Sequence, residues 1–192
     1  VPDMRSVFFQ GALGDINPER TFGGVDTVQD HGRMLAERSR QAMEAVAYAS
    51  DAKLSFAQVT CEMPLDNEDA RREATEFLFQ GKVRKHHEWL AAGGFMREWA
   101  HEVLGLLATH PPDKLCCEIH AIRVGEAAVL GLPGEIYRLI GQEIRKRSPF
   151  KHTWVVGFAN GVVGYVADSR DYEDETYASH LAPKIYGFMP FK

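Results

Sequence analysis

The chain has 192 residues, a formal net charge of −5, 45% hydrophobic residues and 26% charged residues. This composition is typical of a globular protein and excludes the disordered and fibrous classes. No stretch approaches the roughly 20 apolar residues that a membrane span needs, so no transmembrane segment is expected. The acidic balance gives no general attraction to nucleic acid, which leaves a small molecule or another protein as the expected partner.

Three cysteines make a poor disulfide framework, because their number is odd and two of them are neighbours. We expect Cys61, Cys116 and Cys117 to be reduced, buried thiols. This pattern favours the cytoplasm as the compartment. The sequence contains no Cys-x-x-Cys pair, so a structural zinc site is not expected.

The first part of the chain predicts a strand, a shaped turn and a helix. A strand-like segment begins at residue 5, close to Val1, which suggests a piece of a longer domain. A glycine-rich turn follows over Gly11–Pro18. From Asp26 the apolar residues recur at helical spacing, with Asp26 or Thr27 as the cap. The predicted apolar stripe of this helix contains Val28, Leu35, Ala42, Met43 and Val46.

The middle of the chain predicts one strand and at least two helices. Residues 55–63 alternate between two faces and predict a strand. Residues 67–80 and 82–110 are helix-like, and glycines at 81, 93 and 94 divide them into two or three helices. The buried face of the last one is expected to contain Met96, Trp99, Ala100, Val103 and Leu107.

The last part predicts a hairpin of residues 115–124 and 127–132 around a Gly125–Glu126 turn, followed by a helix that Glu135 opens. Residues 153–159 and 162–166 read as strands, 168–175 as a solvated acidic loop, and the tail has little periodicity. Strands and helices alternate coarsely. The predicted fold is therefore a single layered α/β domain over residues 1–192, with a mixed β-sheet flanked by helices.

In α/β sheets ligands gather beyond the carboxyl ends of strands, so the strand-to-loop corners carry the candidate site residues. Glu135 is either a first-turn glutamate that stabilises its helix or a metal ligand or general base. Tyr165 is either a rim aromatic or a ligand. Asp15 is either a turn-forming residue or a catalytic one.

The eight histidines do not form a metal motif by spacing. His86 and His87 lie in a helical stretch, where neighbouring side chains point about 100° apart, so a solvated helix face is expected there. The zinc-protease, nucleophile-elbow, Walker and dinucleotide motifs are absent from the sequence. Spacing alone therefore assigns no function.

Three segments together resemble the neutral/alkaline ceramidase family and its bacterial relatives. They are Phe9–Pro18, Leu130–Glu135 and Gly157–Val166, with the sequences FQGALGDINP, LGLPGE and GFANGVVGYV. They occur in the order found in that family, and the likeness extends from about Val7 to Tyr177. The resemblance implies that this chain corresponds to the later, C-terminal portion of a longer ceramidase-like catalytic domain.

Members of that family are zinc-dependent amidases that cleave the N-acyl bond of ceramide in sphingolipid metabolism. By motif match, the resemblance implies Glu135 and Tyr165 as zinc ligands, with two histidine ligands coming from the earlier half of the family's domain. A catalytic zinc keeps one position open for water, whose pKa it lowers to about 7.

The same resemblance implies that Tyr177, Gly14 and Asn160 bind substrate, and that Asp15 and Asn17 are catalytic residues in the loop beside the metal. Asn17 stands where characterised ceramidases carry a serine. Its amide cannot be a nucleophile, but it could donate a hydrogen bond to an oxyanion.

Two hypotheses follow. The first is a portion of a ceramidase-like zinc amidohydrolase, inactive by itself and completed by the missing half or by a second copy of the chain. The second is a non-catalytic ceramidase-like domain that binds a partner or a lipid ligand.

Overall fold

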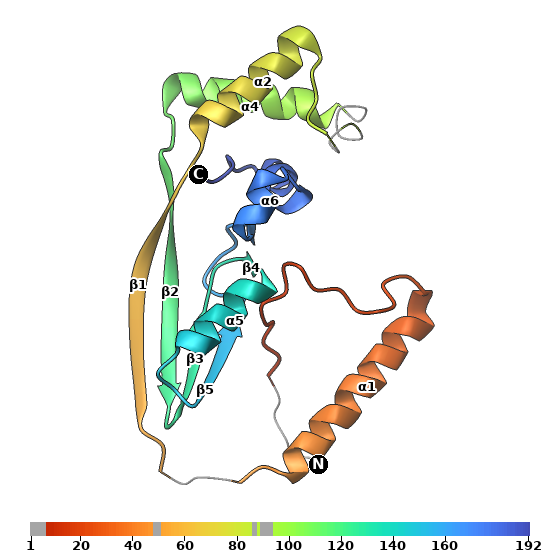
Figure 1. Ribbon diagram of the computed structural model, residues 1–192, viewed down its shortest axis with the longest axis vertical. Coiled ribbons are helices and arrows are strands. Elements are labelled where there is room, and N and C mark those ends of the chain that lie inside the picture. The colour runs from red at the N-terminus through yellow and green to blue at the C-terminus, as the bar shows by residue number, and fades with distance from the viewer. Residues whose placement is uncertain (1–6, 48–50, 86–87, 89–93) are drawn as a thin grey trace.

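The computed structural model describes residues 7–47, 51–85, 88 and 94–192. The helices are α1 (Gly24–Glu44), α2 (Asn67–Gln80), α4 (Phe95–Thr109), α5 (Arg138–Arg147), α6 (Ser169–Glu173), the π-helix η1 (Tyr177–Leu181) and α7 (Ala182–Ile185). The strands are β1 (Leu54–Pro64), β2 (Lys114–Val124), β3 (Ala127–Gly131), β4 (Glu135–Ile136), β5 (His152–Val156) and β6 (Tyr165–Val166). The predicted layered α/β fold with a mixed sheet is confirmed (Figure 1).

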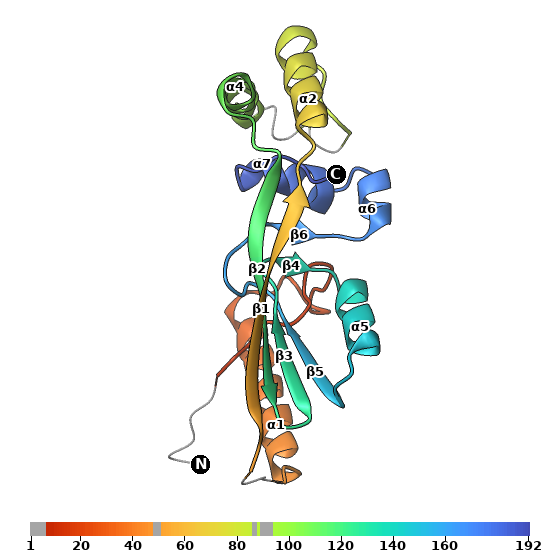
Figure 2. The same ribbon diagram turned by 90° about the vertical axis from the view of Figure 1, so that its left-hand side faces the viewer.

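The larger sheet has the strand order β1-β2-β3-β5, in which β5 runs parallel to β3 and the other pairs are antiparallel. The predicted hairpin is confirmed, and Gly125 occupies its turn with a φ of 60° that favours glycine. Figure 2 shows α5 on one side of β3 and β5. There Ile140 and Ile144 pack in a small core with Ile136 and Val155.

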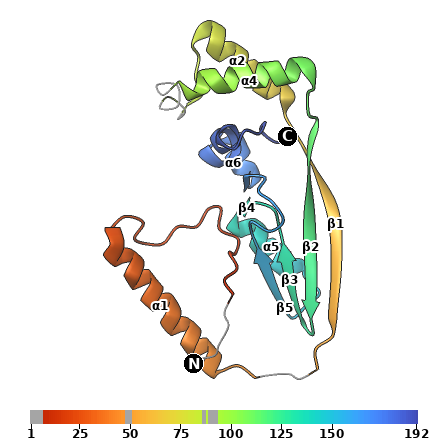
Figure 3. The ribbon, with the colours of Figure 1, turned by 180° about the vertical axis from the view of Figure 1, so that it is seen from behind.

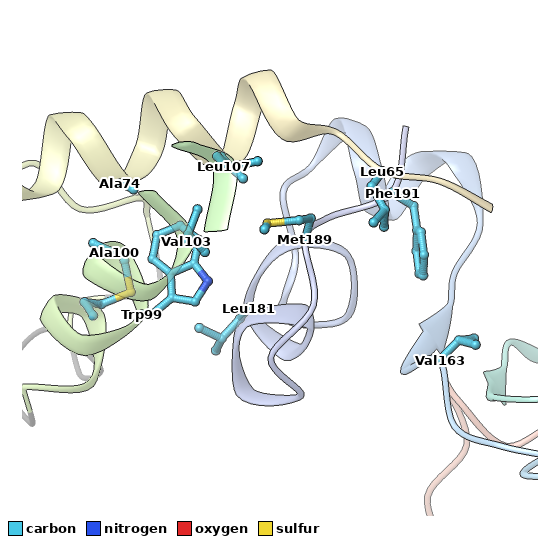
Figure 4. Close-up of a cluster of buried hydrophobic side chains, with 12 residues drawn as sticks. Leu65, Ala74, Trp99, Ala100, Val103, Leu107, Val163, Leu181, Met189 and Phe191 are labelled. Carbon is cyan, nitrogen blue, oxygen red and sulfur yellow. The ribbon is translucent and has the colours of Figure 1, made fainter. Parts of the chain in front are cut away.

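The main core lies at the other end of the β1–β2 ribbon, between the α2–α4 helix pair and the C-terminal segment. All five residues predicted for the inner face of α4 are buried in it. In Figure 4, Trp99 and Val103 of α4 lie near Leu181 and Met189 of the C-terminal segment. The tail therefore belongs to the core, although its sequence shows little periodicity.

Three predictions are wrong. The segment before the glycine-rich turn forms no strand over its described residues, which start at residue 7. Glu135 does not open a helix but forms β4, because its backbone nitrogen donates to the Gly164 oxygen at 2.9 Å. Residues 168–175 are not simply a solvated loop, because they contain α6. The Asp168 carboxylate caps this helix by accepting from the backbone nitrogens of Arg170 and Asp171.

Helix α1 is confirmed, but it begins at Gly24, and neither Asp26 nor Thr27 caps it. Its predicted apolar stripe is not part of a core, since Val28 and Leu35 are exposed. Figures 1 and 3 show α1 standing apart from the sheet. An amphipathic helix thus presents its apolar side without a partner element in the described parts of the chain.

One face of the large sheet carries an apolar row that crosses all four strands. Strand register aligns Phe56, Ile122, Val129 and Trp154 on one face. Phe56 is 61% exposed and Trp154 59% exposed. The chain exposes 13152 Å² in total, whereas a compact monomer of its mass of 21.5 kDa exposes about 9,200 Å². The exposed apolar row is suited to contact another polypeptide.

The three cysteines are free, as predicted. Cys61 and Cys117 face each other across β1 and β2 and are half-buried, whereas Cys116 is exposed. The prediction of burial is wrong for Cys116, because adjacent strand residues point to opposite faces. Of the helices that the structure describes, none has the length and apolar character needed to cross a membrane.

Candidate functional site

The three segments that carry the motifs meet around the small β4–β6 sheet. Backbone hydrogen bonds between them replace the regular ladder of a larger sheet. Written from donor nitrogen to acceptor oxygen, they are Gly14 to Ile136 (2.9 Å), Val163 to Pro133 (2.8 Å), Glu135 to Gly164 (2.9 Å), Gly157 to Gln10 (2.9 Å) and Phe158 to Gly134 (3.1 Å). Segments far apart in the chain are therefore joined directly at Glu135 and its neighbours.

Glycines allow these loops to approach so closely. A Cβ atom at Gly14 would lie 2.5 Å from the Glu135 carbonyl oxygen and 2.8 Å from Cδ1 of Tyr137. A Cβ atom at Gly134 would lie 2.7 Å from the Gly164 carbonyl oxygen. These distances are shorter than van der Waals contact, so the segments can meet only where the side chain is absent.

Replacing Gly14 by alanine is expected to lower the free energy of unfolding by about 1–3 kcal/mol, because the added methyl group overlaps the backbone of β4. Urea denaturation followed by circular dichroism measures the change. Gly11→Ala is the matched control, since an added Cβ there meets nothing within 4 Å. Equal effects of the two substitutions would contradict the close packing of Gly14 against β4.

Glu135 is the buried acid of this site, with 8% of its surface exposed. It lies on β4 directly beside Tyr165 on β6. The Tyr186 hydroxyl donates to Glu135 Oε1 at 2.6 Å. Burial, followed by hydrogen bonding to Glu135, raises the pKa of Tyr165. The hydrogen bond to Glu135, followed by burial, raises the pKa of Tyr186 to about 12. Both phenols are therefore protonated near neutral pH and can donate to the carboxylate.

The charge of Glu135 has no basic counterpart within the described parts of the chain, where no Lys, Arg or His forms an ion pair with it. A buried carboxylate is costly unless hydrogen bonds or a cation compensate it. Two phenols supply part of this compensation. The donor set of one carboxylate and one adjacent phenol suits a cation that accepts oxygen ligands, such as Zn²⁺.

Aromatic rings form a wall beside this carboxylate. The ring of Tyr177 meets that of Tyr165 edge to face, with centroids 5.8 Å apart. On the other side Tyr137 meets Tyr165 with centroids 6.4 Å apart. Tyr137 is buried and its hydroxyl donates to Asp171. Tyr177 is half exposed, so it presents a ring edge that a bound molecule could contact.

The other candidate residues lie around this centre. Asp15 accepts a hydrogen bond from the Arg138 backbone nitrogen at 2.5 Å, so this carboxylate, and not Glu135, sits at the N-terminus of α5. Asn17 lies on the exposed part of the same loop. Asn160 is exposed with a left-handed φ of 63°. The hydrogen bonds found among the described residues do not join Asn17 or Asn160 to Glu135.

The prediction for His86 and His87 lies outside the described residues. Among the described residues, no group of three or more His, Cys, Asp or Glu residues is arranged to hold a metal ion. Glu135 and Tyr165 by themselves offer two oxygen donors, whereas a catalytic zinc usually has three protein ligands.

Sequence reasoning missed Tyr186, Tyr137 and Asp171. Tyr137 follows Glu135 by two residues. Interpreting that segment as an extended strand would have placed both side chains on the same face. Asp171 lay in a stretch interpreted as solvated loop. Tyr186 lies in the aperiodic tail, 51 residues from Glu135, and no local pattern points to it.

Comparison with known proteins finds no matching family model and no matching curated protein. Among solved structures, the chain is similar to the neutral ceramidase from Pseudomonas aeruginosa. The identity is 18% and the TM-score 0.47, and the match covers 89% of this chain and 33% of that one. The chain thus spans about a third of the length of that ceramidase.

Proposed function

We propose that this chain is part of a ceramidase-like, zinc-dependent amidohydrolase that cleaves the N-acyl bond of an amide or lipid substrate. The observation that carries the proposal is the buried Glu135 carboxylate, which contacts phenols and has no basic partner among the described residues. The three motif segments, whose sequences resemble that family, all contribute backbone contacts around it.

Glu135 and Tyr165 would hold the metal, with further ligands coming from a polypeptide outside the described residues. A zinc ion bound there would supply a Lewis acid for the acyl carbonyl. Tyr177 would line the substrate path with its exposed ring edge. Gly14 would contribute to the substrate site through its backbone, which packs against β4 beside Glu135. Asn160 would contact the substrate from the neighbouring loop.

The loop of residues 11–18 would serve the reaction through its polar side chains. Asp15 anchors this loop to the start of α5 through the Arg138 backbone nitrogen. The anchored loop carries Asn17, whose amide nitrogen can donate a hydrogen bond to a developing oxyanion. Asp15 would thus act by holding Asn17 near the substrate.

Glu135→Gln is expected to weaken zinc binding by more than about 100-fold, because removing a ligand exceeds the roughly 10- to 100-fold effect of removing a ligand's hydrogen-bond partner. Isothermal titration of the chain with zinc chloride at neutral pH measures the affinity. Near-ultraviolet difference absorption in the same titration reports whether a tyrosine hydroxyl loses its proton to become a ligand.

Glu126→Gln is the matched control, since Glu126 lies at the exposed hairpin turn and pairs only with Lys151 at 3.5 Å. Its zinc affinity should equal that of the wild type. Wild-type zinc affinity in Glu135→Gln would contradict the assignment of Glu135 as a ligand.

A second function, a non-catalytic domain that binds a partner, is favoured by the exposed apolar row of Phe56, Ile122, Val129 and Trp154. Covering this row would remove apolar surface from water and so stabilise a complex. The zinc titration separates the two functions, because a binding domain does not require its zinc affinity to depend on Glu135.

A further inference from the structure

We propose that Tyr186 is a positioning residue for Glu135 and holds its carboxylate in the orientation that a metal ligand needs. This inference rests on the proposed function, in which Glu135 binds zinc. Its direct basis is the hydrogen bond from the Tyr186 hydroxyl to Glu135 Oε1 at 2.6 Å. The two residues come from different ends of the site, β4 and the end of α7.

Tyr186 is 41% exposed, but two contacts restrain its ring. The ring lies against Gly164, where an added Cβ would be 3.3 Å from Cδ2 of Tyr186. On its other side the Phe188 ring stacks at 27°, with centroids 6.5 Å apart. The Tyr186 backbone nitrogen donates to the Ala182 oxygen at 3.0 Å. A ring held in this way places its hydroxyl with little rotational freedom.

Gly164 contacts both the backbone of Glu135 and the ring of Tyr186, whose hydroxyl binds the Glu135 side chain. Its carbonyl oxygen accepts from the Glu135 nitrogen, and its missing side chain leaves room for the Tyr186 ring. Its φ of 83° is a conformation that favours glycine. The strand position of Glu135 and the direction of its carboxylate are therefore set by contacts that meet at one glycine.

A glutamate side chain has three rotatable bonds, so the carboxylate of an unsupported glutamate samples several directions. Hydrogen-bond partners behind a ligand keep it in the binding direction, and losing such a partner typically weakens metal binding 10- to 100-fold. Tyr186 supplies this support from the C-terminal segment. Tyr165, on the neighbouring strand, also hydrogen-bonds to Glu135 and is the second metal ligand of the proposed function by its motif match.

Tyr186→Phe tests the inference, because it removes the hydroxyl and keeps the ring against Gly164. In the zinc titration its midpoint should move to about 10- to 100-fold higher zinc, while the amplitude of the tyrosine difference signal stays that of the wild type. Tyr172→Phe is the control, since Tyr172 packs at the edge of the main core and its ring contacts His180. It should titrate like the wild type.

The outcomes separate this inference from the proposed function. An unchanged midpoint in Tyr186→Phe, with weakened binding in Glu135→Gln, overturns the positioning role alone. Loss of the difference signal in Tyr186→Phe also overturns it, because Tyr186 would then be a ligand itself. An unchanged midpoint in Glu135→Gln contradicts the proposed function, whatever Tyr186→Phe does. A crystal structure of Tyr186→Phe with a turned Glu135 carboxylate would support the positioning role without any metal.

Discussion

Replacing Arg84 by methionine is expected to lower the free energy of unfolding by about 3–5 kcal/mol, the usual effect of breaking a buried ion pair on one side. The Arg84 side chain is only 11% exposed. Its guanidinium binds Asp69 and Glu175, and its Nε donates to Glu73 Oε2 at 2.8 Å. Methionine fills much of the same volume but leaves these carboxylates without that cation.

The cost is large because Glu73 is buried and the Asp69 side chain is only 12% exposed. Lys184 pairs with Glu73 at 3.1 Å and also lies over the Trp99 ring, so it partly compensates the charge. One ammonium group cannot satisfy the carboxylates that the five donors of a guanidinium reach. The negative charge that is then only partly compensated favours the unfolded state, in which water solvates it.

Urea denaturation monitored by tryptophan fluorescence and by circular dichroism measures this loss, because urea does not screen the ion pairs. Arg72→Met is the matched control, because Arg72 also binds Asp69 but its side chain is 62% exposed. Exposed pairs contribute about 0–1 kcal/mol. A loss of less than about 1 kcal/mol in Arg84→Met would show that this cluster does not stabilise the fold as a buried network.

Met96→Ala is expected to cost about 2–5 kcal/mol, because it removes a side chain from the main core and leaves a cavity. Met96 lies on the inner face of α4 and is completely buried. Around it pack α2 and the C-terminal segment, which close the core from different sides. A rigid core of this kind cannot collapse fully into the space that is left.

Met34→Ala is the matched control for this prediction, since it makes the same change on α1, where Met34 is 57% exposed. Alanine has the higher helix propensity, so this variant should lose less than about 0.5 kcal/mol. Denaturant midpoints of the two variants give the comparison. If Met34→Ala costs as much as Met96→Ala, then α1 packs against an apolar surface in solution.

Arg84→Met and Met96→Ala both affect the C-terminal segment and, through it, the candidate site. Lys184, held by Glu73, lies two residues before Tyr186 in the same helical end. Leu181 and Met189 anchor this segment to the main core. The support that Tyr186 gives to Glu135 therefore depends on a core that is remote from β4, and weakening this core should loosen the carboxylate as well.

Much of the fold could be predicted from the sequence. Periodic spacing identified the buried face of α4, and the Gly125 turn identified the hairpin of β2 and β3. The three motif segments drew attention to Glu135 and Tyr165, which prove to be register neighbours on β4 and β6. The α4 face and the hairpin depend on neighbours along the chain, where helix and strand periods are directly visible, whereas the pair Glu135 and Tyr165 followed from the family resemblance.

By itself, then, the sequence determined the main helices and strands, the α/β class and the candidate pair Glu135 and Tyr165. Only the tertiary structure decided that Glu135 lies on a strand, that the apolar stripe of α1 stays exposed, and that Tyr186 contacts Glu135 across 51 residues. The physical reason is that local propensity acts over a few residues, whereas hydrogen bonds between distant segments depend on where the packed core brings the chain.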